Sequence, residues 1–84
     1  MSRMLKFYRP EFEWIQQRYP EYIEVLPSYE VKGDTVYVTF ETKESYDVVS
    51  QKTIEIIMDE IDSNSELTPD GLRFEDAWYD AVDY

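Results

Sequence analysis

The 84-residue sequence contains no cysteine and no histidine, and each absence excludes a class of chemistry. Without cysteine there is no disulfide framework and no thiolate nucleophile, and without histidine the chain lacks the commonest metal ligand and the usual general base. Carboxylates remain, but 19 acidic residues in so short a chain make chance carboxylate pairs inevitable. We therefore expect a protein that is not an enzyme and that uses no cofactor.

A metal site also lacks support in the sequence. The segment DSNSELTPDG, which starts at Asp62, loosely resembles a calcium loop of the EF-hand type. Such a loop needs glycine at its sixth position and a bidentate glutamate at its twelfth. Leu67 and Arg73 occupy these positions, so we expect no bound metal.

Long apolar runs are missing as well. No segment approaches the roughly 18 apolar residues that a transmembrane helix needs, and the start MSRMLKFYRPEFEW has no signal-peptide pattern. We expect a cytoplasmic protein, in a bacterial or a host cell, that does not bind membranes. Apolar residues make up 43% of the chain and aromatic residues 17%, which is enough for one globular domain over 1–84.

Negative charge is the most pronounced property, with a net charge of -11. Residues 1–52 hold seven basic and nine acidic groups, whereas residues 53–84 hold one basic residue, Arg73, and ten acidic ones. Such a field repels nucleic acid and attracts basic protein surfaces. The few basic residues near the N-terminus do not outweigh it, so we expect no direct binding of nucleic acid.

The N-terminal half contains the pattern of a short helix. Pro10 suits a first helical turn, Phe12 and Ile15 share one side, and Pro20 ends the segment, which predicts a helix over 10–18. The preceding MLKFY alternates apolar and polar residues, as a strand or an ordered arm would.

The clearest pattern is a β-hairpin in SYEVKGDTVYVTFE. If Gly33 and Asp34 form a two-residue type II′ turn, Lys32 pairs with Thr35 and the two faces separate by polarity. The apolar face then holds Tyr29, Val31, Val36, Val38 and Phe40, and Tyr37 lies on the polar face. Upstream, YIEVL alternates like an edge strand before Pro27. We predict an antiparallel sheet over about 22–42.

A central amphipathic helix is predicted over about 44–62, with Thr42 or Ser45 as its N-cap. Its apolar stripe consists of Tyr46, Val49, Thr53, Ile54, Ile57 and Ile61. This helix should cover the apolar face of the hairpin, because a hairpin alone is marginal in water. SNSELTPDG then has the composition of a loop with a turn at Pro69. The fold class is therefore α+β.

The last segment, FEDAWYDAVDY, has helical period with two distinct faces. The packing face contains Phe74, Ala77, Trp78, Ala81 and Val82, with Trp78 as its main anchor. The opposite face contains Glu75, Asp76, Tyr79, Asp80 and Asp83. Like charges at this spacing, close to a helix C-terminus, cost about 1 to 2 kcal/mol in total. The face is therefore either a solvated surface or a recognition surface.

Charge spacing suggests what such a surface would recognise. Four carboxylates over this helix give about one charge per 3 Å, close to the one phosphate per roughly 3.4 Å along a DNA strand. A thinner stripe on the central helix holds Glu44, Glu55, Asp59 and Asp62. Together the stripes could mimic nucleic acid and block the basic groove of a nucleic-acid-binding protein or nuclease, as small acidic inhibitors of bacteriophages and mobile elements do.

The alternative is an immunity protein, antitoxin or adaptor whose affinity comes from aromatic contacts. Tyr37, Tyr79 and Tyr84 are the candidates, because tyrosine is enriched at interface hot spots. The unused edge of the hairpin also leaves a homodimer open.

Overall fold

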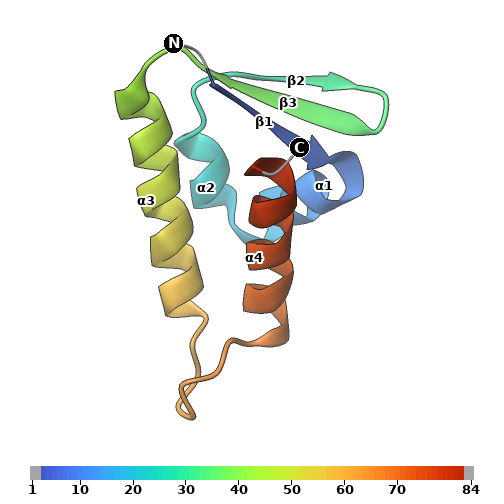
Figure 1. Ribbon diagram of the computed structural model, residues 1–84. Helices are drawn as coiled ribbons and strands as arrows, with labels where there is room; N and C mark the ends of the chain where they lie inside the picture. Colours follow the sequence, from blue (N-terminus) through green and yellow to red (C-terminus); the bar gives the residue numbers. More distant parts are fainter. Residues whose placement is uncertain (1–2, 83–84) are drawn as a thin grey trace.

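In the computed structural model, which describes residues 3–82, the chain has an α+β fold with a three-stranded antiparallel sheet. The elements in order are β1 (Arg3–Tyr8), α1 (Arg9–Arg18), α2 (Pro20–Glu24), β2 (Tyr29–Lys32), β3 (Thr35–Phe40), α3 (Lys43–Asp59) and α4 (Pro69–Val82). β3 is the central strand, between β1 and β2. The helices lie on one side of the sheet, and no described helix covers its other side (Figure 1).

The hairpin prediction is confirmed in its register. Lys32 pairs with Thr35 and Val31 with Val36. Gly33 has a φ of 60°, and Asp34 is not among the residues with positive φ, as a type II′ turn requires. Val36, Val38 and Phe40 are buried, but the whole of β2 is exposed. The apolar face of the hairpin is therefore a core surface only along β3.

The third strand is β1, and the prediction of a strand over 22–26 is wrong. Pro20 instead begins a second short helix, because its fixed φ and missing N–H suit a first helical position. Helical geometry turns Tyr22 into the core, where it is fully buried. The MLKFY segment supplies the missing strand, with Leu5 and Phe7 buried against the helices.

α3 begins where its cap predicts and ends earlier than predicted. The hydroxyl of Thr42 accepts a hydrogen bond from the Ser45 backbone N–H at 3.1 Å. Val49, Thr53 and Ile56 are buried on this helix, whereas Ile54 is 54% exposed. The buried face is rotated from the predicted stripe because α3 packs against α2 and α4 as well as β3. α3 therefore does not cover the sheet alone, since α4 packs on β1.

α4 begins at Pro69, where a turn was predicted. The Thr68 hydroxyl accepts a hydrogen bond from the Gly71 N–H at 3.1 Å, and so caps the helix that Pro69 opens. Phe74 is the main anchor of α4, because it is 1% exposed and its ring lies 5.1 Å from those of Tyr19 and Tyr22. Ala77 and Ala81 are also buried, but Trp78 is only partly buried and Val82 is 40% exposed. Trp78 does pack against the core, as predicted, but the prediction that it is the main anchor of the helix is wrong.

Candidate protein-binding surface

Most of the described basic side chains form ion pairs within the molecule. Among the described residues, six basic side chains form ion pairs with acidic residues of the same chain: Arg9, Arg18, Lys32, Lys43, Lys52 and Arg73. These pairs engage seven acidic residues of the described chain, so the location of its other carboxylates determines where this part of the molecule is most strongly negative.

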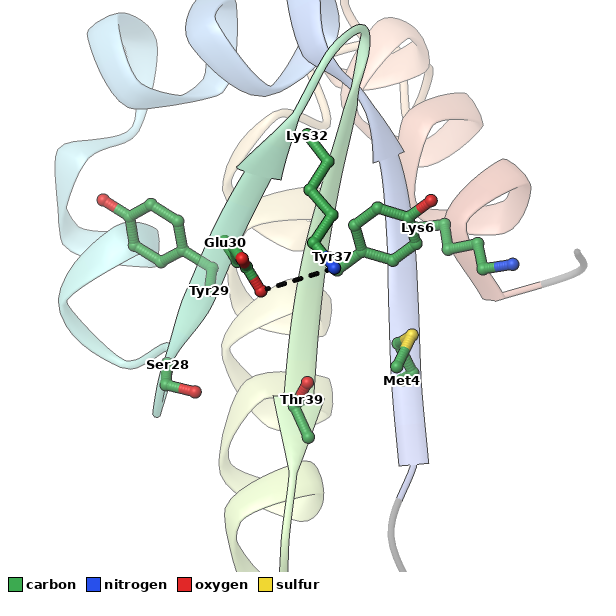
Figure 2. Close-up of a pocket in the computed structure, with 8 residues that line it drawn as sticks. All are labelled: Met4, Lys6, Ser28, Tyr29, Glu30, Lys32, Tyr37 and Thr39. Carbon is green, nitrogen blue, oxygen red and sulfur yellow. Dashed lines mark ion pairs between the residues drawn. The ribbon is translucent and has the colours of Figure 1, made fainter.

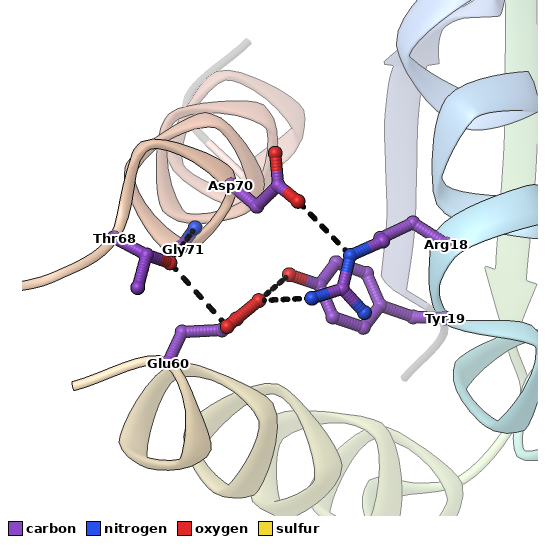
Figure 3. A network of polar contacts seen from close by, with 6 residues as sticks. All are labelled: Arg18, Tyr19, Glu60, Thr68, Asp70 and Gly71. Carbon is purple, nitrogen blue, oxygen red and sulfur yellow. Dashed lines mark hydrogen bonds and ion pairs between the residues drawn. The ribbon is translucent and has the colours of Figure 1, made fainter. Parts of the chain in front are cut away.

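The most extensive polar network joins the ends of α1 and α3 to the start of α4 (Figure 3). A carboxylate oxygen of Glu60 accepts hydrogen bonds from the Arg18 guanidinium at 2.8 Å and from the Tyr19 hydroxyl. Arg18 also donates to Asp70 at 3.0 Å, and Thr68 donates to the second Glu60 oxygen at 3.3 Å. Burial and the bond to Glu60 raise the pKa of Tyr19, so that it remains a neutral donor. We interpret this network as a structural clamp.

A second clamp connects α4 to α1. The Arg73 guanidinium donates to both Glu11 oxygens, at 2.9 and 2.8 Å, and lies 4.3 Å from the centroid of the Trp14 ring. This bidentate hydrogen bonding lowers the pKa of Glu11. The two clamps together hold the N-terminal part of α4, and they pair the charges of Asp70 and Arg73 with opposite charges on α1.

Further along α4, the solvent-facing carboxylates have no such partners. Asp76 and Asp80 are exposed, Glu75 is partly buried, and no described basic side chain forms an ion pair with any of them. Tyr79 lies between them in sequence and is 59% exposed. The structure therefore brings these predicted residues together on one helix, whereas Asp83 and Tyr84 lie outside the described residues.

Sequence reasoning missed Leu72, which extends this surface. Leu72 is 49% exposed and precedes Tyr79 by seven residues, or about two turns, so both lie on one side of α4. The signal was present in the sequence, but the misread turn at Pro69 left Leu72 outside the predicted helix. We call Leu72, Asp76, Tyr79 and Asp80 the outward face of α4.

The other predicted acidic stripe keeps Glu44, Glu55 and Asp59 on one side of α3, but that side does not face α4. Glu55 lines a hollow beside the end of α2, and Asp59 lines another beside the end of α1. The Glu55 carboxylate lies 3.9 Å from the Lys52 Nζ atom. α4 instead meets α3 through Trp78, whose ring lies 6.3 Å from that of Tyr46. Tyr46 precedes Glu55 by nine residues, so the two side chains leave α3 in about opposite directions. The outward face and this stripe are not side by side.

Asp62 does not continue the stripe, because it lies beyond the end of α3. Its carboxylate accepts hydrogen bonds from the backbone N–H groups of Asn64 and Glu66, at 2.8 and 3.1 Å. The residue therefore shapes the loop between α3 and α4.

Tyr37 lies on a different surface, the uncovered side of the sheet (Figure 2). The Nζ atoms of Lys6 and Lys32 each lie 5.7 Å from the centroid of its ring. These lysines and the neighbouring strands leave Tyr37 only partly exposed. Tyr37 therefore belongs to the uncovered surface of the sheet, whereas α4, which carries Tyr79, lies on the opposite side of the sheet.

Comparisons with protein-family models, with curated proteins and with solved structures find no match for the chain. Within residues 3–82, no helix is long and apolar enough to cross a membrane. In the same part of the chain, no three carboxylates are arranged as a metal ion would require.

Proposed function

We propose that the domain is a non-enzymatic binding protein that recognises a basic surface of a nucleic-acid-binding protein through the outward face of α4. The observation that carries this proposal is the pair Asp76 and Asp80, both exposed and neither in an ion pair with a described basic side chain. A partner that supplies arginine or lysine would neutralise this local field.

The outward face suits such a partner in two respects. Asp76 and Asp80 are one turn apart, or about 6 Å along the helix, and each can accept charge-assisted hydrogen bonds from arginine or lysine. A groove that binds phosphates presents donors of this kind. Tyr79 and Leu72 add apolar contact area that phosphates do not provide, which favours a protein ligand over simple charge screening.

The experiment compares two variants with the same net charge. The test variant is Glu75→Gln with Asp76→Asn and Asp80→Asn. The matched control is Glu21→Gln with Glu24→Gln and Glu41→Gln, at exposed residues that form no described ion pair. Each variant changes the net charge from -11 to -8, since three acidic residues become neutral. The wild type and both variants are immobilised and exposed to bacterial lysate, and bound proteins are eluted with a salt gradient and identified by mass spectrometry.

We expect the wild type and the control variant to capture a nucleic-acid-binding protein that elutes with salt. The test variant should not capture this protein. The wild-type chain should also displace DNA from that protein. Equal capture by the control and test variants would overturn the proposal.

The substitution Tyr79→Ala separates the proposal from its main alternative. If this change abolishes a salt-resistant complex that the charge variant retains, the domain is an immunity, antitoxin or adaptor module that binds through tyrosine. The exposure of Tyr79 is the observation that supports this second function.

A further inference from the structure

β2 forms an open edge of the sheet. Its place in the order β1-β3-β2 leaves one side of β2 without a neighbouring strand within residues 3–82. The other outer strand, β1, is instead packed by α4. In Figure 2, β2 carries Glu30 and Lys32 beside the central strand β3.

The direction of the backbone groups on β2 follows from the hairpin register. A two-residue turn makes Lys32 and Thr35 a hydrogen-bonded pair, and the Ser28 carbonyl accepts from the Thr39 N–H at 3.2 Å. Even-numbered residues of β2 therefore point their N–H and C=O groups toward β3. Those of Tyr29 and Val31 point to the open edge, and no hydrogen bond to them is found within the described chain.

This edge lacks most of the features that prevent strands from pairing between molecules. β2 contains no proline, its register with β3 shows no bulge, and Tyr29 and Val31 are 42% and 46% exposed. Natural edge strands are protected by proline, bulges, inward-pointing charges or a covering segment, none of which β2 shows in the described chain, and also by short length and lysine, both of which β2 has. β2 has charged residues, Glu30 and Lys32, but they lie on the uncovered side of the sheet.

We propose that two copies of the chain pair through β2, antiparallel about a two-fold axis at Val31, to form a continuous six-stranded sheet. Each Val31 would donate its N–H to, and accept at its C=O from, Val31 of the second copy. The proposal concerns a different surface from the outward face of α4 and does not depend on the function proposed above.

Charge selects this register over its neighbours. With Val31 opposite Val31, Glu30 of each copy lies opposite Lys32 of the other, which gives two cross-strand ion pairs. Shifting the pairing so that Tyr29 lies opposite Val31 would bring the two copies of Glu30 together. A further shift would place Val31 opposite Pro27, which has no N–H to donate.

The rearrangement that this requires is small. Within one chain the Lys32 Nζ atom lies 3.8 Å from a carboxylate oxygen of Glu30, and the side chains of Glu30 and Lys32 are 69% and 64% exposed. An ion pair this exposed is weak and exchanges partners readily.

Sedimentation velocity of the full chain over a wide concentration range tests the proposal. We expect a concentration-dependent dimer. Val31→Pro should remove the dimer while far-UV circular dichroism stays unchanged, because the N–H it deletes points away from β3.

Charge variants test the register and remain informative if the proline variant does not fold. K32E alone and E30K alone should each weaken the homodimer about tenfold, because two attractive pairs become repulsive. The double variant E30K/K32E restores opposite charges in the proposed register and should restore the dimer. A chain that stays monomeric at the highest concentration, or a dimer that none of these variants changes, would overturn the proposal.

Discussion

The hydroxyl groups of Tyr22 and Thr53 form a polar pair inside the core. The two side chains are 0% and 1% exposed, and their oxygens lie 3.2 Å apart. Thr53 also donates to the Val49 carbonyl at 2.8 Å. Burial raises the pKa of Tyr22, so its hydroxyl stays neutral in the folded protein. Each hydroxyl therefore satisfies the other where water cannot reach.

This pair predicts a non-additive response to mutation. Thr53→Val should lower the free energy of unfolding by about 1 to 3 kcal/mol, because the Tyr22 hydroxyl is left buried without a partner. Tyr22→Phe in the same chain removes that stranded hydroxyl, so the double variant should be more stable than Thr53→Val alone. Urea denaturation followed by tryptophan fluorescence measures Thr53→Val, Tyr22→Phe alone and the double variant. Simple addition of the two single effects would contradict the interpretation.

At the scale of elements, local signals were predictable and packing directions were not. Pro10, the Gly33-Asp34 turn and the Thr42 cap act within a few residues, and each fixed a boundary or register correctly. The burial of Tyr22 and the rotation of α3 depend on which helices pack together, and no local pattern specifies that. In the candidate site, helical period placed Asp76, Tyr79 and Asp80 on one side, whereas Leu72 was lost with the start of the helix.

The junction of α3 and α4 depends on the absence of a side chain at Gly71. A Cβ there would lie 2.7 Å from the Glu60 Cβ, an atom fixed close to the backbone, and 3.1 Å from Leu67. We expect Gly71→Ala to destabilise the fold by about 1 to 2 kcal/mol, because overpacking outweighs the better helix propensity of alanine. Gln51→Ala, an exposed substitution in α3, is the control and should change stability little. Thermal unfolding of both variants provides the comparison, and a more stable Gly71→Ala protein would show that the helices can separate without cost.

For the whole molecule, the two clamps and the unpaired carboxylates have opposite effects on stability. The clamps of Arg18 and Arg73 fix α4 to the rest of the fold. The remaining acidic residues repel one another, and α4 has no basic residue in its last turn to offset the negative end of the helix. An arrangement that costs stability and serves no packing purpose is expected where a surface is kept for binding.

This reasoning predicts that removing the charge of the outward face stabilises the protein. The variant Glu75→Gln with Asp76→Asn and Asp80→Asn should gain about 1 kcal/mol at low salt, because the Asp76–Asp80 repulsion and the poorly placed Asp80 charge near the helix end disappear. The replacements keep similar side-chain size and helix propensity, so charge is the main variable. The control variant at Glu21, Glu24 and Glu41 should gain less, since none of these residues is on α4 and Glu21 lies in the first turn of α2, where a negative charge is favourable. Urea denaturation in about 10 mM and about 500 mM NaCl measures both, and the gain should shrink at high salt, where surface charges are screened. A test variant less stable than the wild type would show that these carboxylates support the fold, and would remove the argument that they are retained for a partner.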